Sequence, residues 1–411
     1  MAWPPAAAVM TRAAGPMAPS RRLSADDLGR AVPGEAVSFA SRVPAGATVA
    51  VAMSGGVDSS VAATLCVAAG LATIGVTMRL WGTDEMERGE GGCCSLDAVE
   101  DARRVCARLG IPHYVLNMRD HFERTVIRDF LEEYGAGRTP NPCIRCNETV
   151  KFKELLRRVS AVSATHVATG HYARITEAAG GTLHLRRGLD RRKDQSYTLY
   201  RCDRDVLSHT LLPLGELEKV RVRQLASDLG LAVAHKPDSQ DLCFVGGRDH
   251  RLVLERELAG QFAPGPIVDL SGAQVGTHRG IPFYTVGQRQ GLGGENGSAH
   301  SEPRYVVEVD AANNLVVVGP RRALEVSSCR LARCSYTTSP LQECEVVGLA
   351  QTRAHAEPEP ATWRRLPEGV AEVEFHRPQI GIARGQSLVL YDEDRVLAGG
   401  EVAAVVRKGI A

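Results

Sequence analysis

The chain has 411 residues, too many for one ordinary hydrophobic core, so two or three domains are expected. Hydrophobic residues make up 44% and charged residues 24%, a balance typical of globular proteins, and no apolar run approaches the roughly 18–20 residues of a membrane span. The formal net charge of +1 excludes a polycation, so any nucleic-acid surface must be a local patch.

The first 25 residues contain no Asp or Glu and carry Arg12, Arg21 and Arg22 among Ala, Pro, Ser and Met. This composition predicts a disordered leader over residues 1–45 and is typical of an organellar transit peptide, with a mitochondrion favoured over a plastid. The alternative is an Ala/Pro-rich tail on a protein that stays in the cytoplasm. The eleven cysteines, an odd number in a large chain, argue against a secreted disulfide scaffold and for a reducing compartment.

An α/β domain is predicted over residues 46–220. The apolar run 47–53 suits a buried parallel strand, a Gly-rich turn follows, and a helical pattern at 59–69 leads to a second strand at 71–78. Further helices and strands alternate along the chain, at 98–109, 113–116, 122–134, 151–159 and 166–169. This order predicts a doubly wound, mostly parallel sheet.

Beyond residue 213 the sequence pattern changes from alternating strands and helices to one charged helix followed by short strands. A charged helix is predicted at 216–230, and from about residue 265 short β-branched runs stand between Gly and Pro. These runs predict the strands of small β-barrels or sandwiches, at 282–286, 304–309, 315–318, 343–349, 371–375 and 387–391.

Residues 54–59, Ser-Gly-Gly-Val-Asp-Ser, join the first strand directly to a helix. The glycines allow close approaches that a β-carbon would block, so free N–H groups and the helix dipole can face an anion. Ser54 and Ser59 add hydroxyl donors, and Asp58 can hold a Mg²⁺ ion that bridges phosphate oxygens. The segment lacks the Gly-Lys-Ser/Thr residues that end a Walker motif. It resembles instead the PP-loop of ATP pyrophosphatases, which cleave ATP between the α and β phosphates. A chance Gly/Ser turn is the alternative.

Cys143 and Cys146 form a C-x-x-C pair at a Pro-rich turn before a helix, where a thiolate is favoured. Three interpretations stay open: a zinc half-site, a redox or sulfur-carrying pair, and partial ligation of an iron–sulfur cluster. Cys243 lies in a polar loop and taken alone would be a structural cysteine. Cys66 and Cys106 lie on apolar helix faces and are predicted to be structural, whereas the adjacent pair Cys93 and Cys94 has no assignment.

Seven motifs occur in order and resemble those of the tRNA-specific 2-thiouridylases, the MnmA/TrmU family, from about residue 48 to the C-terminus. They are SGGVDS, GVTMRLW with Met78, TPNPCIRCNETVKF, TGHYAR, KDQSY, KPDSQDLCFV and YTVGQRQGLG. The resemblance implies an N-terminal PP-loop domain, a small central domain at 221–300 and a C-terminal β-barrel at 301–411.

The resemblance also implies the roles of individual residues. ATP would be bound by Ala52, Met53, Ser54, Gly55, Gly56, Val57, Asp58 and Ser59, with Met78 and Gly170 near the adenosine. The target uridine would be approached by Asn141, Pro142 and Cys143, and the rest of the tRNA would be touched by His171, Lys193, Asp194, Gln195, Arg353 and Gln386. Cys146 would be the nucleophile, and Cys243 would carry a persulfide.

The implied reaction adenylates O2 of a wobble uridine in the tRNAs for Lys, Glu and Gln, and then replaces that oxygen with sulfur. ATP and Mg²⁺ are the expected cofactors. A cysteine desulfurase or persulfide relay is the expected partner beside tRNA, and the chain would act as a monomer. Some family members carry Asp at the position of Cys143, so this cysteine is a candidate acid/base or a cluster ligand. A persulfide–disulfide cycle and an iron–sulfur cluster held by three cysteines both remain open, as does a non-catalytic tRNA-binding protein.

Overall fold

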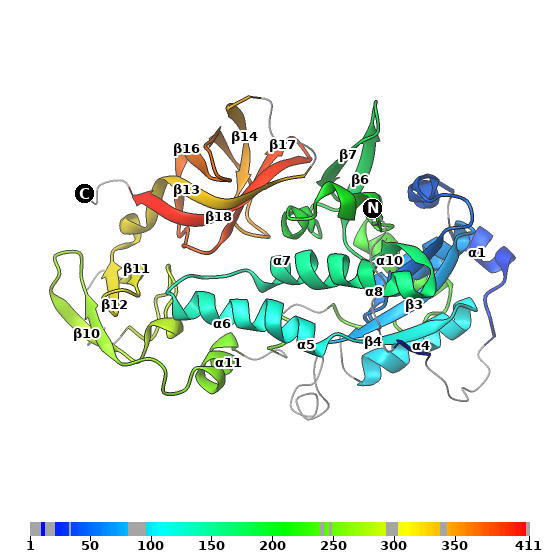
Figure 1. Cartoon of the computed structure of the whole chain (residues 1–411), viewed down its shortest axis with the longest axis horizontal. Helices are drawn as coiled ribbons and strands as arrows, with labels where there is room; N and C mark the ends of the chain where they lie inside the picture. Colours follow the sequence, from blue (N-terminus) through cyan, green and yellow to red (C-terminus); the bar gives the residue numbers. More distant parts are fainter. Residues whose placement is uncertain are drawn as a thin grey trace. The chain divides into compact units, whose positions relative to one another are not determined.

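The structure is a computed structural model that describes residues 10–12, 21–32, 34–80, 96–238, 242–245, 249–292, 303–337 and 343–407 (Figure 1). The chain divides into two compact units. The first comprises Met1–Thr125 and Cys143–Arg248, and the second Val126–Pro142 and Asp249–Ala411. In the described part of the chain, no helix is both long and apolar enough to span a bilayer.

A six-stranded sheet forms the centre of the first unit, in the order β1-β4-β3-β2-β5-β8. All neighbouring pairs are parallel except β1 with β4. The strands are β1 (Met10–Arg12), β2 (Thr48–Ala52), β3 (Ala72–Arg79), β4 (His113–Asn117), β5 (Ala164–Ala168) and β8 (Thr210–Leu211). The chain builds outward from β2 through β3 and β4, then returns to place β5 on the other side of β2. The predicted doubly wound fold is confirmed, and its switch point lies between β2 and β5, where such sheets bind their ligands.

Helices flank this sheet and connect its strands (Figure 1). They are α2 (Val57–Ala68), α4 (Leu96–Leu109), α5 (Arg119–Phe122), α7 (Pro142–Cys146), the π-helical η3 (Asn147–Glu154), α8 (Leu155–Val159), η5 (Ser196–Leu199), α9 (Arg204–Ser208) and α10 (Lys219–Asp228). A hairpin of β6 (Ala173–Ala178) and β7 (Thr182–Arg187) follows β5. Val49 and Val51 of β2 and Val61 of α2 are fully buried, because helices cover both faces of a parallel sheet.

The prediction of a disordered leader is wrong for residues 10–12, which form β1, and for residues 21–32 and 34–43. Here α1 (Ala25–Ala31) and η1 (Gly34–Arg42) pack on the core of the first unit, with Leu28 and Val32 buried. Ser24 caps α1 in a capping box with Asp27. The Arg42 guanidinium donates to the carbonyl oxygens of Leu207 and Thr210, at 2.7 and 3.1 Å. The prediction rested on the absence of Asp and Glu from the first 25 residues, and this composition says nothing of the tertiary contacts that order the stretch.

Replacing Leu28 with alanine is expected to lower the free energy of unfolding by about 2–5 kcal/mol, because a buried leucine leaves a cavity. Urea denaturation of the full chain measures the change. The exposed Arg30 on the same helix provides the control, since Arg30→Ala should stay within about 0.5 kcal/mol of the native protein. A Leu28→Ala variant as stable as that control would show that α1 does not belong to the core.

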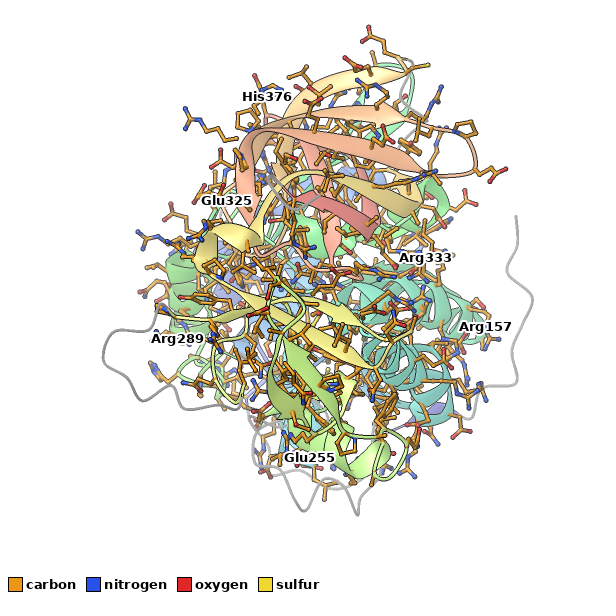
Figure 2. All side chains as sticks on the ribbon, turned by 90° about the vertical axis from the view of Figure 1, so that its left-hand side faces the viewer. Arg157, Glu255, Arg289, Glu325, Arg333 and His376 are labelled. Carbon is orange, nitrogen blue, oxygen red and sulfur yellow. The ribbon has the colours of Figure 1, made fainter. Side chains whose placement is uncertain are left out.

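The second unit contains two β structures. A small sheet has the order β10-β9-β12-β11, and a six-stranded barrel has the order β13-β16-β15-β14-β17-β18, closed by pairing of β13 with β18. The strands are β9 (Gly265–Val268), β10 (Gln274–His278), β11 (Tyr305–Asp310), β12 (Leu315–Gly319), β13 (Glu325–Tyr336), β14 (Glu345–Gln351), β15 (Glu359–Arg365), β16 (Ala371–Ile380), β17 (Ser387–Asp392) and β18 (Arg395–Arg407). Figure 2 labels Glu325 and Arg333 on β13 and His376 on β16. The predicted architecture of a small middle domain and a C-terminal barrel is confirmed. The predicted boundary at residue 300 is wrong, because β11 and β12 belong to the small sheet and the barrel begins at Glu325.

The helices of the second unit are α6 (Arg128–Gly135), α11 (His250–Glu257), η6 (Ile281–Phe283) and η7 (Arg321–Leu324). The strand predicted at 282–286 is wrong, because η6 occupies its start. Pro282 has no N–H group for a strand ladder, and its fixed φ suits the first turn of a helix. Trp363 and Leu388 are fully buried inside the barrel.

Candidate active site

The phosphate loop lies between β2 and α2, at the carboxyl edge of the sheet. Gly55 has φ +68°, and a β-carbon on it would lie 2.2 Å from the carbonyl oxygen of Ala98 on α4. Gly56 is the N-cap residue of α2 and has no side-chain cap. The Ser59 hydroxyl accepts a hydrogen bond from the Ser54 N–H at 3.1 Å and so braces the turn. The loop therefore presents backbone donors at a helix N-terminus, as an anion requires.

Two other predicted ATP-binding residues lie at the same edge. Gly170 follows β5, and a β-carbon on it would lie 2.8 Å from the backbone of Asp58 and Ser59, so its turn packs directly on the phosphate loop. Met78 is near the end of β3, the other neighbour of β2, and is half-buried. The switch point of the sheet thus brings the three segments that are predicted to bind ATP to one edge of the sheet.

Asp58 is held by two side chains that were not among the predicted site residues. Tyr172 donates its hydroxyl to Oδ1 at 2.7 Å, and the Lys219 ammonium lies 2.7 Å from each carboxylate oxygen. Burial, reinforced by Asp58, raises the pKa of Tyr172. A Mg²⁺ ion on Asp58 would have to share this carboxylate with a buried ammonium. The side chains present therefore do not fit the predicted metal-ligand role of Asp58.

The C-x-x-C pair occupies α7, which continues into η3. Cys143 is exposed, and Cys146 is 5% exposed. Asn147, next to Cys146, donates to the Thr198 hydroxyl at 3.1 Å and so ties this helix to η5, which begins within the KDQSY motif. The Arg145 guanidinium, between the two cysteines, donates to the Glu148 carboxylate at 3.1 Å.

Cys243 is half-buried in the KPDSQDLCFV segment. The ring of Phe244 packs edge-on against Phe122 of α5, with centroids 6.4 Å apart. On the same helix, His121 Nε2 lies 3.2 Å from the carbonyl oxygen of Thr149 in η3. The segment of Cys243 and the helix that follows Cys146 therefore contact one short helix, α5.

The cysteines predicted to be structural differ in burial from Cys143 and Cys243, which are exposed and half-buried. Cys66 and Cys106 are buried as predicted, and burial raises the pKa of both thiols, that of Cys106 to about 12. Among the residues that the structure describes, no three His, Cys, Asp or Glu side chains are grouped so that they could hold a metal ion. The iron–sulfur alternative finds no support in this arrangement. Cys93 and Cys94 lie outside the described residues.

Asp238, in the same segment as Cys243, is the centre of a cluster of cations. Its carboxylate lies 2.8 Å from Lys193, 2.8 Å from Lys219 and 2.6 Å from Arg223. Burial pushes the pKa of Asp238 upward, but hydrogen bonds from Lys193 and Lys219 outweigh it and lower the pKa to about 2. Asp238 and Tyr172 stood inside recognised motifs, whereas no sequence signal pointed to Lys219.

The structure does not support direct tRNA contacts by two of the predicted residues. Asp194 is 8% exposed and accepts hydrogen bonds from the Gly188 and Ser196 N–H groups. His171 is equally buried, with Nδ1 2.8 Å from the Thr169 hydroxyl, and burial lowers its pKa to about 3. Both side chains brace loops and offer little surface to RNA.

The other predicted tRNA contacts have different positions. Lys193 and Gln195 are half-buried, and Gln195 Oε1 accepts from the Tyr172 N–H at 3.1 Å. Arg353 and Gln386 belong to the second unit, as do Asn141 and Pro142. Arg353 is exposed and donates to the Gly381 carbonyl at 2.7 Å, and Gln386 Oε1 accepts from the Ala383 N–H at 3.1 Å.

A doubly wound parallel sheet whose central strand delivers Ser-Gly-Gly-Val-Asp-Ser into a helix defines a PP-loop nucleotide-binding domain. Three family profiles match the chain in order. Their descriptions are tRNA methyl transferase HUP domain (residues 47–247), tRNA methyl transferase PRC-barrel domain (252–320) and aminomethyltransferase beta-barrel domain (326–402).

Comparison with curated relatives identifies the family within the class of PP-loop proteins. The tRNA-specific 2-thiouridylase MnmA of Heliobacterium modesticaldum is 49% identical over 86% of this chain and 92% of its own length. That of a Roseiflexus species (strain RS-1) is 46% identical over 87% and 99%. An NMN synthetase from Francisella tularensis has 18% identity and a TM-score of 0.33 over 56% of this chain and 81% of its own, too low to add to the assignment. The chain belongs to the tRNA-specific 2-thiouridylase (MnmA) family.

Proposed function

We propose that this protein uses ATP to replace the 2-oxygen of a tRNA wobble uridine with sulfur, in the tRNAs for Lys, Glu and Gln. The observation that carries the proposal is a set of contacts within the first unit. Asp58 of the phosphate loop is bonded through Lys219 to Asp238, five residues before Cys243. The family's named activity requires ATP chemistry and sulfur chemistry at one site, and this geometry links the two.

The first step activates the base. Uracil O2 attacks the α phosphate of ATP, the bond to the β phosphate breaks, and pyrophosphate leaves with its electron pair. The backbone donors of residues 54–59 would stabilise charge on the phosphates. A Mg²⁺ ion bound with ATP would supply further positive charge to the phosphates. The target base must first be unstacked from the anticodon loop.

The second step delivers sulfur. The terminal sulfur of a Cys243 persulfide attacks C2 of the adenylated uridine. The Cys146 thiolate then attacks Sγ of Cys243, the persulfide S–S bond breaks, and its electron pair remains on the transferred sulfur. Collapse to C=S expels AMP with the former O2, and a dithiol reductant restores both cysteines from their disulfide. We assign proton transfer to Cys143, and its exposure at the start of α7 supports this role.

The chain needs a sulfur donor, for which a cysteine desulfurase or persulfide relay is the fitting class, and it is proposed to act as a monomer. We place it in a mitochondrion, supported by the acid-free composition of residues 1–25. Because α1 and η1 are folded, the targeting signal would lie before residue 21. Diffuse cytosolic fluorescence from a reporter fused to residues 1–45 would contradict this placement.

The adenylation step is tested by ATP–pyrophosphate exchange. Purified protein should incorporate labelled pyrophosphate into ATP when an unmodified tRNA for Glu is present and not when that tRNA carries cytidine at the wobble position. A non-catalytic tRNA-binding protein would show no exchange with either RNA. An exchange that needs no tRNA would instead identify a PP-loop enzyme with another acceptor.

A further inference from the structure

The segment before Cys243 touches the phosphate loop at two points. The Lys236 ammonium donates to the Gly55 carbonyl at 3.1 Å and lies 2.9 Å from Asp101 on α4. Two residues further on, Asp238 meets Lys219, which also holds Asp58. The chain that leads to the predicted sulfur carrier is therefore tied to the nucleotide loop by one direct bond and one bridging cation.

Lys219 has an unusual position for a lysine. It is 7% exposed, and its ammonium lies 2.7 Å from Asp58 and 2.8 Å from Asp238. Desolvation makes such charge interactions stronger than they would be in water, so the site responds steeply to a new charge. The phosphates of a nucleotide would bring several negative charges to the loop that contains Asp58. The three N–H donors of Lys219 are already taken up by both carboxylate oxygens of Asp58 and one of Asp238, so a phosphate oxygen can bond to the ammonium only by displacing one of them.

We propose that Lys219 is a positioning residue that couples nucleotide binding at the phosphate loop to the reactivity of Cys243. Phosphate oxygens compete with Asp238 for the Lys219 ammonium, and Asp238 then keeps only Lys193 and Arg223. With one of its three cations withdrawn, the segment before Cys243 is held less firmly, and the Cys243 thiol becomes more accessible. This coupling rests on the proposed function, and it would expose the sulfur carrier only when ATP is in place.

The test measures alkylation of Cys243 by iodoacetamide in the full chain, followed by peptide mass spectrometry. A hydrolysis-resistant analogue, α,β-methylene ATP, is added at saturation, and no tRNA or sulfur donor is needed. The native protein should show at least a threefold faster reaction at Cys243 with the analogue. The exposed Cys344 of the second unit serves as an internal standard and should not respond.

Three variants show whether Lys219 carries the coupling. Lys219→Met removes the charge and should abolish the response to the analogue, and Lys219→Arg should restore at least half of it. Arg221→Met, at an exposed position of the same helix, is the matched control and should respond like the native protein. An unchanged or slower reaction of native Cys243, or a full response in Lys219→Met, would overturn the coupling.

Asp238→Asn separates coupling from loss of nucleotide binding or folding. Its side chain keeps its size and lies outside the phosphate loop, so equilibrium dialysis should give analogue binding within about threefold of native, while the alkylation response is lost. Binding without a response in the native protein would overturn the coupling and leave the proposed function intact. Absence of any analogue binding by the native protein would overturn both.

Discussion

Replacing either Cys146 or Cys243 with serine is expected to reduce 2-thiouridine formation at least about 1,000-fold, because a hydroxyl can neither carry sulfane sulfur nor close a disulfide. Adenylation needs neither thiol, so tRNA-dependent ATP–pyrophosphate exchange should stay within about threefold of native. The double variant should be no worse than the single ones, since the two cysteines act as one unit. Nucleoside mass spectrometry after reaction with unmodified tRNA measures the product.

Two further variants serve as a control for this prediction and as a test of the iron–sulfur alternative. Cys344→Ser, at an exposed position in the second unit, should leave thiolation unchanged. Cys143→Asp should keep activity within about tenfold, because a carboxylate can replace a thiol in proton transfer but not as an iron–sulfur ligand. Full activity in both Cys146→Ser and Cys243→Ser would rule out the persulfide route, and complete loss in Cys143→Asp would favour the cluster.

Replacing Gly55 with alanine is expected to weaken ATP binding and lower the thiolation rate, each by at least about 100-fold. Two effects combine at this position. Its φ of +68° disfavours any residue with a β-carbon, and that carbon would lie 2.2 Å from the Ala98 carbonyl oxygen. The clash is with backbone, so the loop itself must move, and its N–H donors would no longer converge on the phosphates. Equilibrium dialysis with ATP measures the loss.

Gly46 provides the matched control. It also has a positive φ, +79°, but a β-carbon there would meet nothing within 4 Å. Gly46→Ala therefore carries the backbone strain alone, about 1–2 kcal/mol, before the start of β2 and so at the opposite end of this strand from the loop, and ATP binding should be unchanged. Native-like ATP binding by Gly55→Ala would mean that the loop does not cradle phosphates as proposed.

The sequence predicted the elements whose physical signals are local. Buried parallel strands such as β2 consist of apolar residues, and a Gly-Gly turn between a strand and a helix is typical of a loop that binds phosphate. Residues 21–43 were misjudged because their order depends on tertiary contacts. Leu28 and Val32 are buried only where α1 meets the core of the first unit, and such packing leaves little mark on composition. Pro282 was misjudged for the opposite reason, since its own backbone chemistry opposed the strand.

The residues of the candidate site also divide into those with a local sequence signal and those whose role depends on tertiary contacts. SGGVDS and the cysteine motifs could be found from residue types and spacing, because their chemistry depends on those types. The role of Lys219 could not, since a lysine at the start of a charged helix normally faces solvent. Only the fold brings it between Asp58 and Asp238, 161 residues from the first of them in sequence. Asp194 and His171 show the converse, because residues in a functional motif can serve to brace its loops.

The proposed function requires that one site uses ATP to put sulfur on a tRNA uridine. The most direct measurement incubates the purified full chain with ATP, Mg²⁺, an unmodified tRNA for Glu, a cysteine desulfurase, cysteine and a dithiol reductant, followed by nucleoside mass spectrometry. We expect 2-thiouridine at the wobble position, with one AMP formed for each sulfur transferred and no product when ATP is omitted. AMP formation without 2-thiouridine, or 2-thiouridine formed without ATP, would contradict the proposed function.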